Sequence, residues 1–339
     1  MLSVAPGSTL PRTPLAGIAM QYAMERERFI GLAVLPPFIT DERAGERMVW
    51  SNKTGLGLAN VDRAYGGEFS RVDDVALPKS FSCKPRGLER AIDLMQASEL
   101  GRFIVAPMAT AARLTVMQLM RAMEFNIAAV AFNPTLFAPA SGEDAGLSFT
   151  AAGPKLNRDV AADVEAWIAN SHSNVLNQCG AAPDTVVLSN KTYFALGRNT
   201  QVRARIISQF GDRGFTVLAD GRVIPTTGAL AELFQVKEVL VGFAKYDAAP
   251  EGKQLVTTDI WNVDRALWCV REQAQDLEMV QYGRTFVWGQ WSGPNGEPFV
   301  APNYPEPNRL SEVVQAYHVY EPQVFNPRAA YLWTGIDAP

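Results

Sequence analysis

The chain has 339 residues, of which 47% are apolar and 19% charged, so it holds enough apolar material for a sizeable core. Its 31 basic and 35 acidic residues give a formal net charge of −4, which argues against a protein that binds nucleic acid tightly by neutralising phosphates. The cysteines Cys83, Cys179 and Cys269 are too far apart for a CxxC pair and favour reduced, buried thiols over a disulfide framework.

The first forty residues show little regular pattern. Pro6, Pro11 and Pro14 each fix a backbone angle and remove an amide donor, and a short helical candidate follows at Ile18 to Phe29. We interpret residues 1–40 as an extended arm, and an ordinary frayed terminus fits the same pattern. The start has no basic region followed by a continuous apolar run, so we expect neither a signal peptide nor a membrane segment.

Residues 41–82 predict two strands joined by a long tip that contains glycines. Residues 47–51 alternate between apolar and polar side chains, and residues 72–82 do so more loosely. A lone two-stranded hairpin is only marginally stable in water. We therefore expect this hairpin to rest on another surface, which is either the core of the chain itself or a neighbouring molecule.

Residues 107–131 carry the strongest helical pattern of the chain. Pro107 suits the first turn of a helix, and Asn133 and Pro134 mark its end. A helix of this length spans about 37 Å. Its methionine-rich face indicates core packing more than a cofactor site, so we expect it to serve as a structural spine.

A loop is expected at residues 138–153 and a helix at 160–179. Strands and helices then alternate through a compact α/β unit. Its expected elements are a strand at 184–189, a helix starting at Lys191 and capped by Asn190, helices near 199–210 and 227–235, a strand at 237–244, and strands through Trp261, at 267–270 and at 285–288. The last predicted strands, 313–320 and 329–333, have no partner nearby in sequence. We expect them to return to the segment before residue 183, which would make that domain discontinuous.

The sequence contains no complete motif of a catalytic, nucleotide-binding or metal-binding protein. His172 and His318 lie far apart, whereas a zinc site needs about four ligands. Gly252 and Lys253 lack the earlier glycine of a phosphate loop, and no GxSxG motif occurs. Asp73 and Asp74 would point to opposite faces of a strand. We expect no catalytic site, no cofactor and no bound metal.

Four local sequences, taken with the order of the elements, point to one known family. They are Arg63 to Gly67 followed by Val72 to Asp74, Leu119 to Ala129 with Glu124 inside it, Ala182 to Ser189, and Leu233 to Ala244. Over essentially its whole length the chain resembles the major capsid proteins of tailed bacteriophages, which have the Hong Kong 97-like fold.

The resemblance implies an α+β fold with five parts. They are an N-terminal arm at 1–40, an extended hairpin loop, or E-loop, at 41–82, a peripheral domain at 83–182 with its spine helix at 107–131, an α/β axial domain at 183–300, and C-terminal strands at 301–339 that complete the peripheral domain.

The resemblance also implies a structural role and no enzymatic one. Such a protein forms hexamers and pentamers of an icosahedral shell around the double-stranded DNA of a phage, which it contacts weakly and without sequence specificity. It is assembled in the host cytoplasm and resides in the virion capsid. The hairpin begins soon after residue 40, so we expect scaffolding to come from a separate protein, beside a portal protein and a decoration protein.

The contacts between subunits are expected at Trp50, Lys53, Arg63, Tyr65, Glu124 and Asn326. Some members of the family cross-link a hairpin lysine to an asparagine of a neighbouring peripheral domain, and Lys53 and Asn326 lie in the corresponding regions. Ordinary solvated side chains are the interpretation we favour for that pair. Two other functions stay open: an encapsulin-like nanocompartment shell with a protein cargo, and an α/β enzyme built on residues 183–300.

Overall fold

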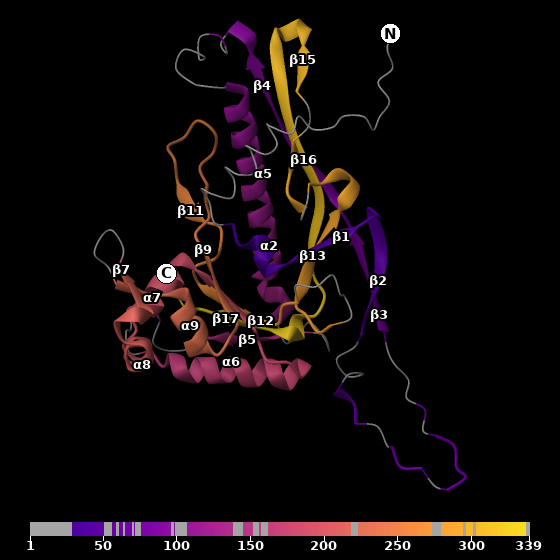
Figure 1. Ribbon diagram of the computed structural model, residues 1–339, viewed down its shortest axis with the longest axis vertical. Coiled ribbons are helices and arrows are strands. Elements are labelled where there is room, and N and C mark those ends of the chain that lie inside the picture. Colours follow the sequence, from indigo (N-terminus) through magenta and orange to yellow (C-terminus); the bar gives the residue numbers. More distant parts are fainter. Residues whose placement is uncertain are drawn as a thin grey trace.

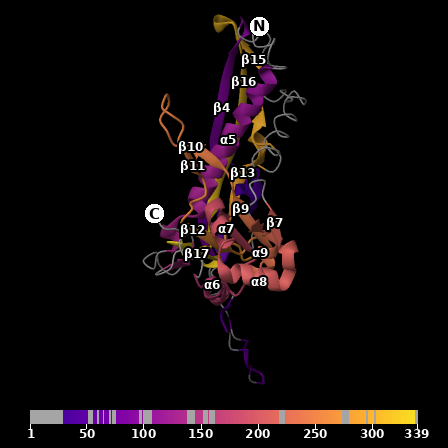
Figure 2. The ribbon, with the colours of Figure 1, turned by 90° about the vertical axis from the view of Figure 1, so that its left-hand side faces the viewer.

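A computed structural model of the chain describes residues 29–50, 56–58, 61–63, 65–69, 71, 76–95, 98, 107–137, 145–151, 156, 162–217, 223–272, 279–293, 296–300 and 303–336. Most of the predicted arm, nearly all of its helical candidate, Lys53, Asp73 and Asp74 lie outside these residues. The molecule is elongated, with a long helix and long strands at one end, a more compact α/β part, and a projecting hairpin (Figures 1 and 2).

One sheet runs along the length of the molecule, with β1, β13, β16 and β14 in that order and with β4 and β15 also paired to β16 (Figure 1). Its strands are β1 (Pro37–Thr40), β4 (Lys84–Asp93), β13 (Gly283–Trp288), β14 (Phe299–Val300), β15 (Tyr304–Glu306) and β16 (Ser311–Val324). Helix α5 (Pro107–Ala131) lies along β4 and β16 and buries Val116 and Leu119 beside Val314. The helix predicted at residues 107–131 is confirmed.

A second sheet forms the centre of the α/β part, with strand order β5, β17, β12, β6, β9. Its strands are β5 (Leu147–Thr150), β6 (Thr185–Ser189), β9 (Glu238–Gly242), β12 (Arg265–Cys269) and β17 (Ala330–Thr334). Four helices pack with this sheet around one apolar core: α6 (Val164–Cys179), α7 (Asn190–Leu196), α8 (Thr200–Phe210) and α9 (Thr227–Phe234).

Shorter elements connect these parts. They are α2 (Gly31–Val34), β7 (Phe215–Val217), β8 (Val223–Pro225), β10 (Lys245–Asp247), β11 (Thr257–Asp259) and the 3-10 turns η1 (Pro134–Phe137), η3 (Gly211–Gly214), η4 (Gly289–Trp291), η6 (Pro307–Arg309) and η7 (Pro327–Ala329).

The long sheet and the α/β part share one buried core. Trp261, Tyr282, Tyr320 and Leu332 belong to a single apolar cluster that also includes side chains of α2 and α5. Tyr282 on the connection into β13 donates its hydroxyl hydrogen bond to the carbonyl of Ala131 at the end of α5, at 2.8 Å. The spine helix is therefore held to both sheets by the same core.

The predicted hairpin is present, and its base lies on the long sheet. Strands β2 (Ala44–Trp50) and β3 (Ala76–Ser82) are antiparallel, which confirms the predicted strands over the residues described. The Phe81 ring stacks on Phe286 of β13 with centroids 4.4 Å apart. The Gln323 side-chain amide on β16 donates to the carbonyl of Ser80 at 3.0 Å.

Both predicted tail strands are found, and their partners lie far away in sequence. Strand β16 pairs with β4 over ten residue pairs, so it returns to the segment before residue 183 as expected. Strand β17 also pairs with a strand before residue 183, because it lies between β5 and β12 in the sheet of the α/β part. The sequence pattern places the strand at 285–288 in the α/β unit. In the structure this strand, β13, pairs with β1 and β16 in the long sheet. These pairings are non-local, and sequence periodicity alone does not specify them.

Three local predictions are wrong. The expected loop at 138–153 contains strand β5, which is anchored by parallel pairing to β17. Trp261 lies between β11 and β12 and outside any strand, and its buried indole packs in the core cluster that includes side chains of α5. Ser189 caps helix α7 by accepting from the amide of Thr192, whereas Asn190 is its first residue and donates to Asp259 at 3.0 Å. The α+β fold class is confirmed.

Candidate functional site

The hairpin tip presents apolar side chains that the described part of the chain leaves uncovered. We use this name for residues 56–58, 61–63, 65–69 and 71. The exposed fractions are 103% for Leu58, 87% for Val61, 110% for Tyr65 and 76% for Phe69. The hairpin projects from the body of the molecule (Figure 1), and exposed apolar groups on such a projection form a candidate contact surface.

Two predicted contact residues, Arg63 and Tyr65, belong to this tip. Arg63 donates from Nε to the carbonyl of Gly67 at 2.6 Å, and its guanidinium lies 4.2 Å from the centroid of the Phe69 ring. These contacts hold Arg63, Gly67 and Phe69 close together at the tip. A third predicted residue, Trp50, ends strand β2 opposite Ala76.

Glu124 lies in the core of its own chain. Glu124 is 2% exposed, and its carboxylate accepts three hydrogen bonds from within the chain. The amides of Ile30 and Gly31, at the start of α2, donate at 3.0 and 2.6 Å, and the indole Nε1 of Trp261 donates at 2.6 Å. Because the first amides of a helix lack partners inside it, this carboxylate acts as a distant cap for α2. Glu124 thus joins the residues that follow the arm, the spine helix and the α/β part.

Two glycines make room for this arrangement. A Cβ atom at Gly31 would lie 2.5 Å from the Oε2 atom of Glu124. A Cβ atom at Gly242 would overlap the indole ring of Trp261. Both positions therefore require the absence of a side chain.

Asn326 precedes the turn η7, and its backbone is tied to the chain's own core. Its amide donates to the carbonyl of Tyr282 at 3.2 Å, and its carbonyl accepts from Ala329 at 3.1 Å. Lys53, its suggested partner in a cross-link, is not among the described residues. The suggested pairing of these two residues stays a prediction.

The thiols are inaccessible. Cys83, Cys179 and Cys269 are all buried and free. Burial raises the pKa of Cys83 to about 11 and also raises the pKa of Cys179 and Cys269. Among the described residues no group of three His, Cys, Asp or Glu side chains could hold a metal ion. Within the same part of the chain, none of the helices has the length and apolar character needed to cross a membrane.

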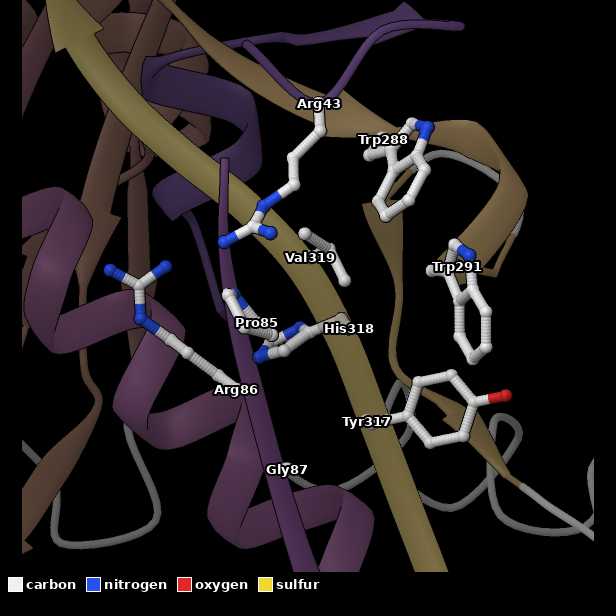
Figure 3. Close-up of a pocket in the computed structure, with 9 residues that line it drawn as sticks. All are labelled: Arg43, Pro85, Arg86, Gly87, Trp288, Trp291, Tyr317, His318 and Val319. Atoms are coloured by element: carbon white, nitrogen blue, oxygen red, sulfur yellow. The ribbon is translucent and has the colours of Figure 1, made fainter. Parts of the chain in front are cut away.

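A pocket of about 340 Å³ opens where the base of the hairpin meets the long sheet (Figure 3). Trp288, Trp291 and Tyr317 line one side as a row of rings, with neighbouring centroids 6.2 and 5.9 Å apart. Arg43 extends its guanidinium over the pocket from the connection between β1 and β2 (Figure 3). We call this site the aromatic pocket; its remaining lining residues are Pro85, Arg86, Gly87, His318 and Val319.

The positive charge of the aromatic pocket comes from Arg43. Its Nε donates to the carbonyl of Cys83 at 3.4 Å, and no described carboxylate pairs with it. Arg86 points away from the pocket (Figure 3), donates to the carbonyl of Tyr320 and pairs with Glu321 at 3.6 Å. Burial, helped by the charge of Arg86, lowers the pKa of His318 to about 3, so that ring is neutral near pH 7.

The aromatic pocket has no local sequence motif that would predict it. Arg43, Trp288 and Tyr317 meet only because β13 pairs with both β1 and β16. The available signal was weak: Trp288 and Trp291 stand three residues apart in a segment with many glycines.

Comparison with protein-family models gave no match, and no curated protein matches the sequence. Solved structures do match. A phage-related protein from Bordetella bronchiseptica has a TM-score of 0.66 at 16% identity, covering 98% of this chain and 99% of that one. The capsid of the cyanophage P-SCSP1u has a TM-score of 0.60 at 11% identity, covering 98% and 92%. A virus-like particle from Pyrococcus furiosus has a TM-score of 0.54 at 9% identity, covering 95% and 98%. The chain therefore has the fold of phage capsid proteins, as the resemblance implied.

Proposed function

We propose that this chain is a major capsid protein that assembles with copies of itself into a closed shell around phage DNA. The observation that carries the proposal is the hairpin tip, whose apolar side chains Leu58, Val61, Tyr65 and Phe69 are exposed on a chain with a capsid fold. Exposed apolar surface of this kind gains its burial from a neighbour, so the stability of the hairpin is coupled to assembly.

The shell is proposed to consist of hexamers and pentamers in icosahedral order. A scaffolding protein, a portal protein and a decoration protein are the proposed partners. The net charge of −4 suits a shell that contacts double-stranded DNA weakly and non-specifically. Assembly would take place in the host cytoplasm, and the mature protein would reside in the virion.

A shell that carries a protein cargo is the second candidate. The similarity to the virus-like particle from Pyrococcus furiosus favours it, because that fold serves particles other than those of the phages named above. The contents of the particle distinguish the two functions. No specific observation favours the other alternative, an enzyme built on residues 183–300. The described residues present no metal-binding cluster and no accessible thiol that would support it.

The test is the sedimentation of the purified full-length chain, followed by analysis of what the particles contain. We expect fast-sedimenting particles of uniform size from the chain alone or from the chain with a co-expressed scaffold. DNA protected from nuclease in particles from infected cells supports the phage function, and a single co-purifying enzyme supports the cargo shell. A small oligomer of fixed size under all these conditions would contradict both.

A further inference from the structure

We propose that the aromatic pocket is the seat of Glu68 and Phe69 from the hairpin tip of a second copy of this chain. This inference rests on the proposed function, because it requires copies of the chain to meet. It goes further by assigning the two surfaces that meet and the pair of side chains that fixes their register.

The pocket and the hairpin tip that is proposed to fill it both present exposed aromatic rings. Trp291 is 50% exposed at the pocket, and Phe69 is 76% exposed at the tip. The pocket volume of about 340 Å³ lies at the lower end of the roughly 300–1,000 Å³ that is usual for small-ligand sites. This space suits one aromatic side chain and a short neighbouring group. Stacked or edge-on contacts between aromatic rings are favourable beyond the burial of their area.

The polar part of the match is a pair of opposite charges. Arg43 faces the pocket with no carboxylate partner among the described residues. Glu68 stands directly before Phe69, is exposed, and forms no ion pair with a described residue. A carboxylate delivered beside the aromatic ring would pair with the guanidinium, for which a bidentate geometry is available.

The buried face of the pocket contains a further unpartnered group. His318 is fully buried, and both of its ring nitrogens lack a hydrogen-bond partner. Buried polar atoms in folded proteins nearly always have partners. The pocket is thus incomplete in the single chain in both its charge and its hydrogen bonding.

A second copy is a better occupant than other segments of the same chain. The pocket is lined by residues of β4, β13 and β16, and the tip of the same chain projects away from these strands in both views (Figures 1 and 2). The other candidate is the arm. Its glutamates, Glu25 and Glu27, are each followed directly by an arginine, which would compete for them. In the tip, an unpaired glutamate is followed directly by an aromatic residue.

The decisive experiment mixes two singly substituted proteins. Phe69→Cys and Trp291→Cys are purified separately, co-assembled, and treated with a short bis-maleimide, which reacts with accessible thiols only. The native cysteines are buried, so the background is low. We expect a cross-linked dimer in the mixture and none in particles of either variant alone. Particles that form from the mixture without a dimer would overturn the pocket assignment and leave the proposed shell function intact.

Charge exchange provides a second test that needs no cysteine. We expect Arg43→Glu and Glu68→Arg each to lower the assembled fraction about tenfold, and the double variant to restore most of it. Arg213→Glu, an exposed arginine on η3, serves as the matched control and should assemble normally. If the double variant assembles no better than either single variant, the two charges do not meet. If the wild-type protein forms no particles, that result contradicts the proposed shell function itself, and the pocket assignment falls with it.

Discussion

The carboxylate of Glu124 accepts a 2.6 Å hydrogen bond from the indole of Trp261, which lies 137 positions later in the chain. The same carboxylate accepts from the first amides of α2, so one side chain joins three parts of the molecule. Each of these donors is buried. Removal of the acceptor would leave them without partners, which costs about 1–3 kcal/mol per group.

We expect Glu124→Ala to destabilise the folded subunit by about 3–5 kcal/mol, because it leaves buried donors unsatisfied and opens a cavity. Glu124→Gln should cost less, about 2 kcal/mol. Its side-chain oxygen still accepts hydrogen bonds, whereas its NH2 group replaces the second oxygen and faces a donor that then has no acceptor. Urea unfolding followed by Trp fluorescence would measure both. Trp261→Phe, which removes one donor and keeps an aromatic ring, is the control. Equal stability of Glu124→Ala and wild type would contradict this role.

Gly242 is expected to tolerate no side chain. Gly242→Ala places a Cβ atom in the Trp261 ring, and such overpacking usually costs about 1–3 kcal/mol. Gly228, in the first turn of α9, has open space around its Cα. Gly228→Ala should therefore be neutral or stabilising by up to about 1 kcal/mol. Thermal unfolding of the two variants compares them directly, and similar losses in both would contradict the steric explanation.

His318 should make the stability depend on pH. Burial lowers its pKa from 6.5 to about 3 in the folded chain, so the unfolded chain takes up the proton first as the pH falls. This contribution is complete above pH 6.5 and is lost on the way to pH 3, at about 1.4 kcal/mol per pH unit. Between pH 7 and 5 the wild type should lose roughly 2 kcal/mol more unfolding free energy than His318→Leu. Parallel curves for the two proteins would show that the histidine is not buried in its neutral form.

Shortening the hairpin should separate assembly from folding. Replacement of residues 57–67 by a short turn removes Leu58, Val61 and Tyr65, which the described chain leaves exposed, and keeps Leu56, which lies beside Gly180. The unfolding free energy of the subunit should change by less than about 0.5 kcal/mol, as for other surface changes. The assembled fraction should fall to background in velocity sedimentation. A large loss of subunit stability would mean that the tip belongs to the core of its own chain.

The sequence predicts local elements well where physical signals coincide. Pro107 at the first turn and Pro134 after the last residue bracket α5, and its apolar face completes the pattern. The strands at both ends of the hairpin and the two tail strands were also predictable from alternation. In each case the determining residues are close together in the chain.

Contacts between distant segments could not be predicted in the same way. Glu124 meets Ile30 and Trp261 only after three segments have packed, and nothing near it in sequence reveals its donors. The aromatic pocket likewise depends on β13 lying between β1 and β16. Strand β5 was missed because its pairing with β17 crosses more than half of the chain.

Negative-stain electron microscopy of the purified full-length chain, at high concentration and with a scaffold if one is needed, tests the central claim most directly. The proposed function predicts closed shells of uniform diameter. A homogeneous monomer under every condition that keeps the protein folded would contradict it.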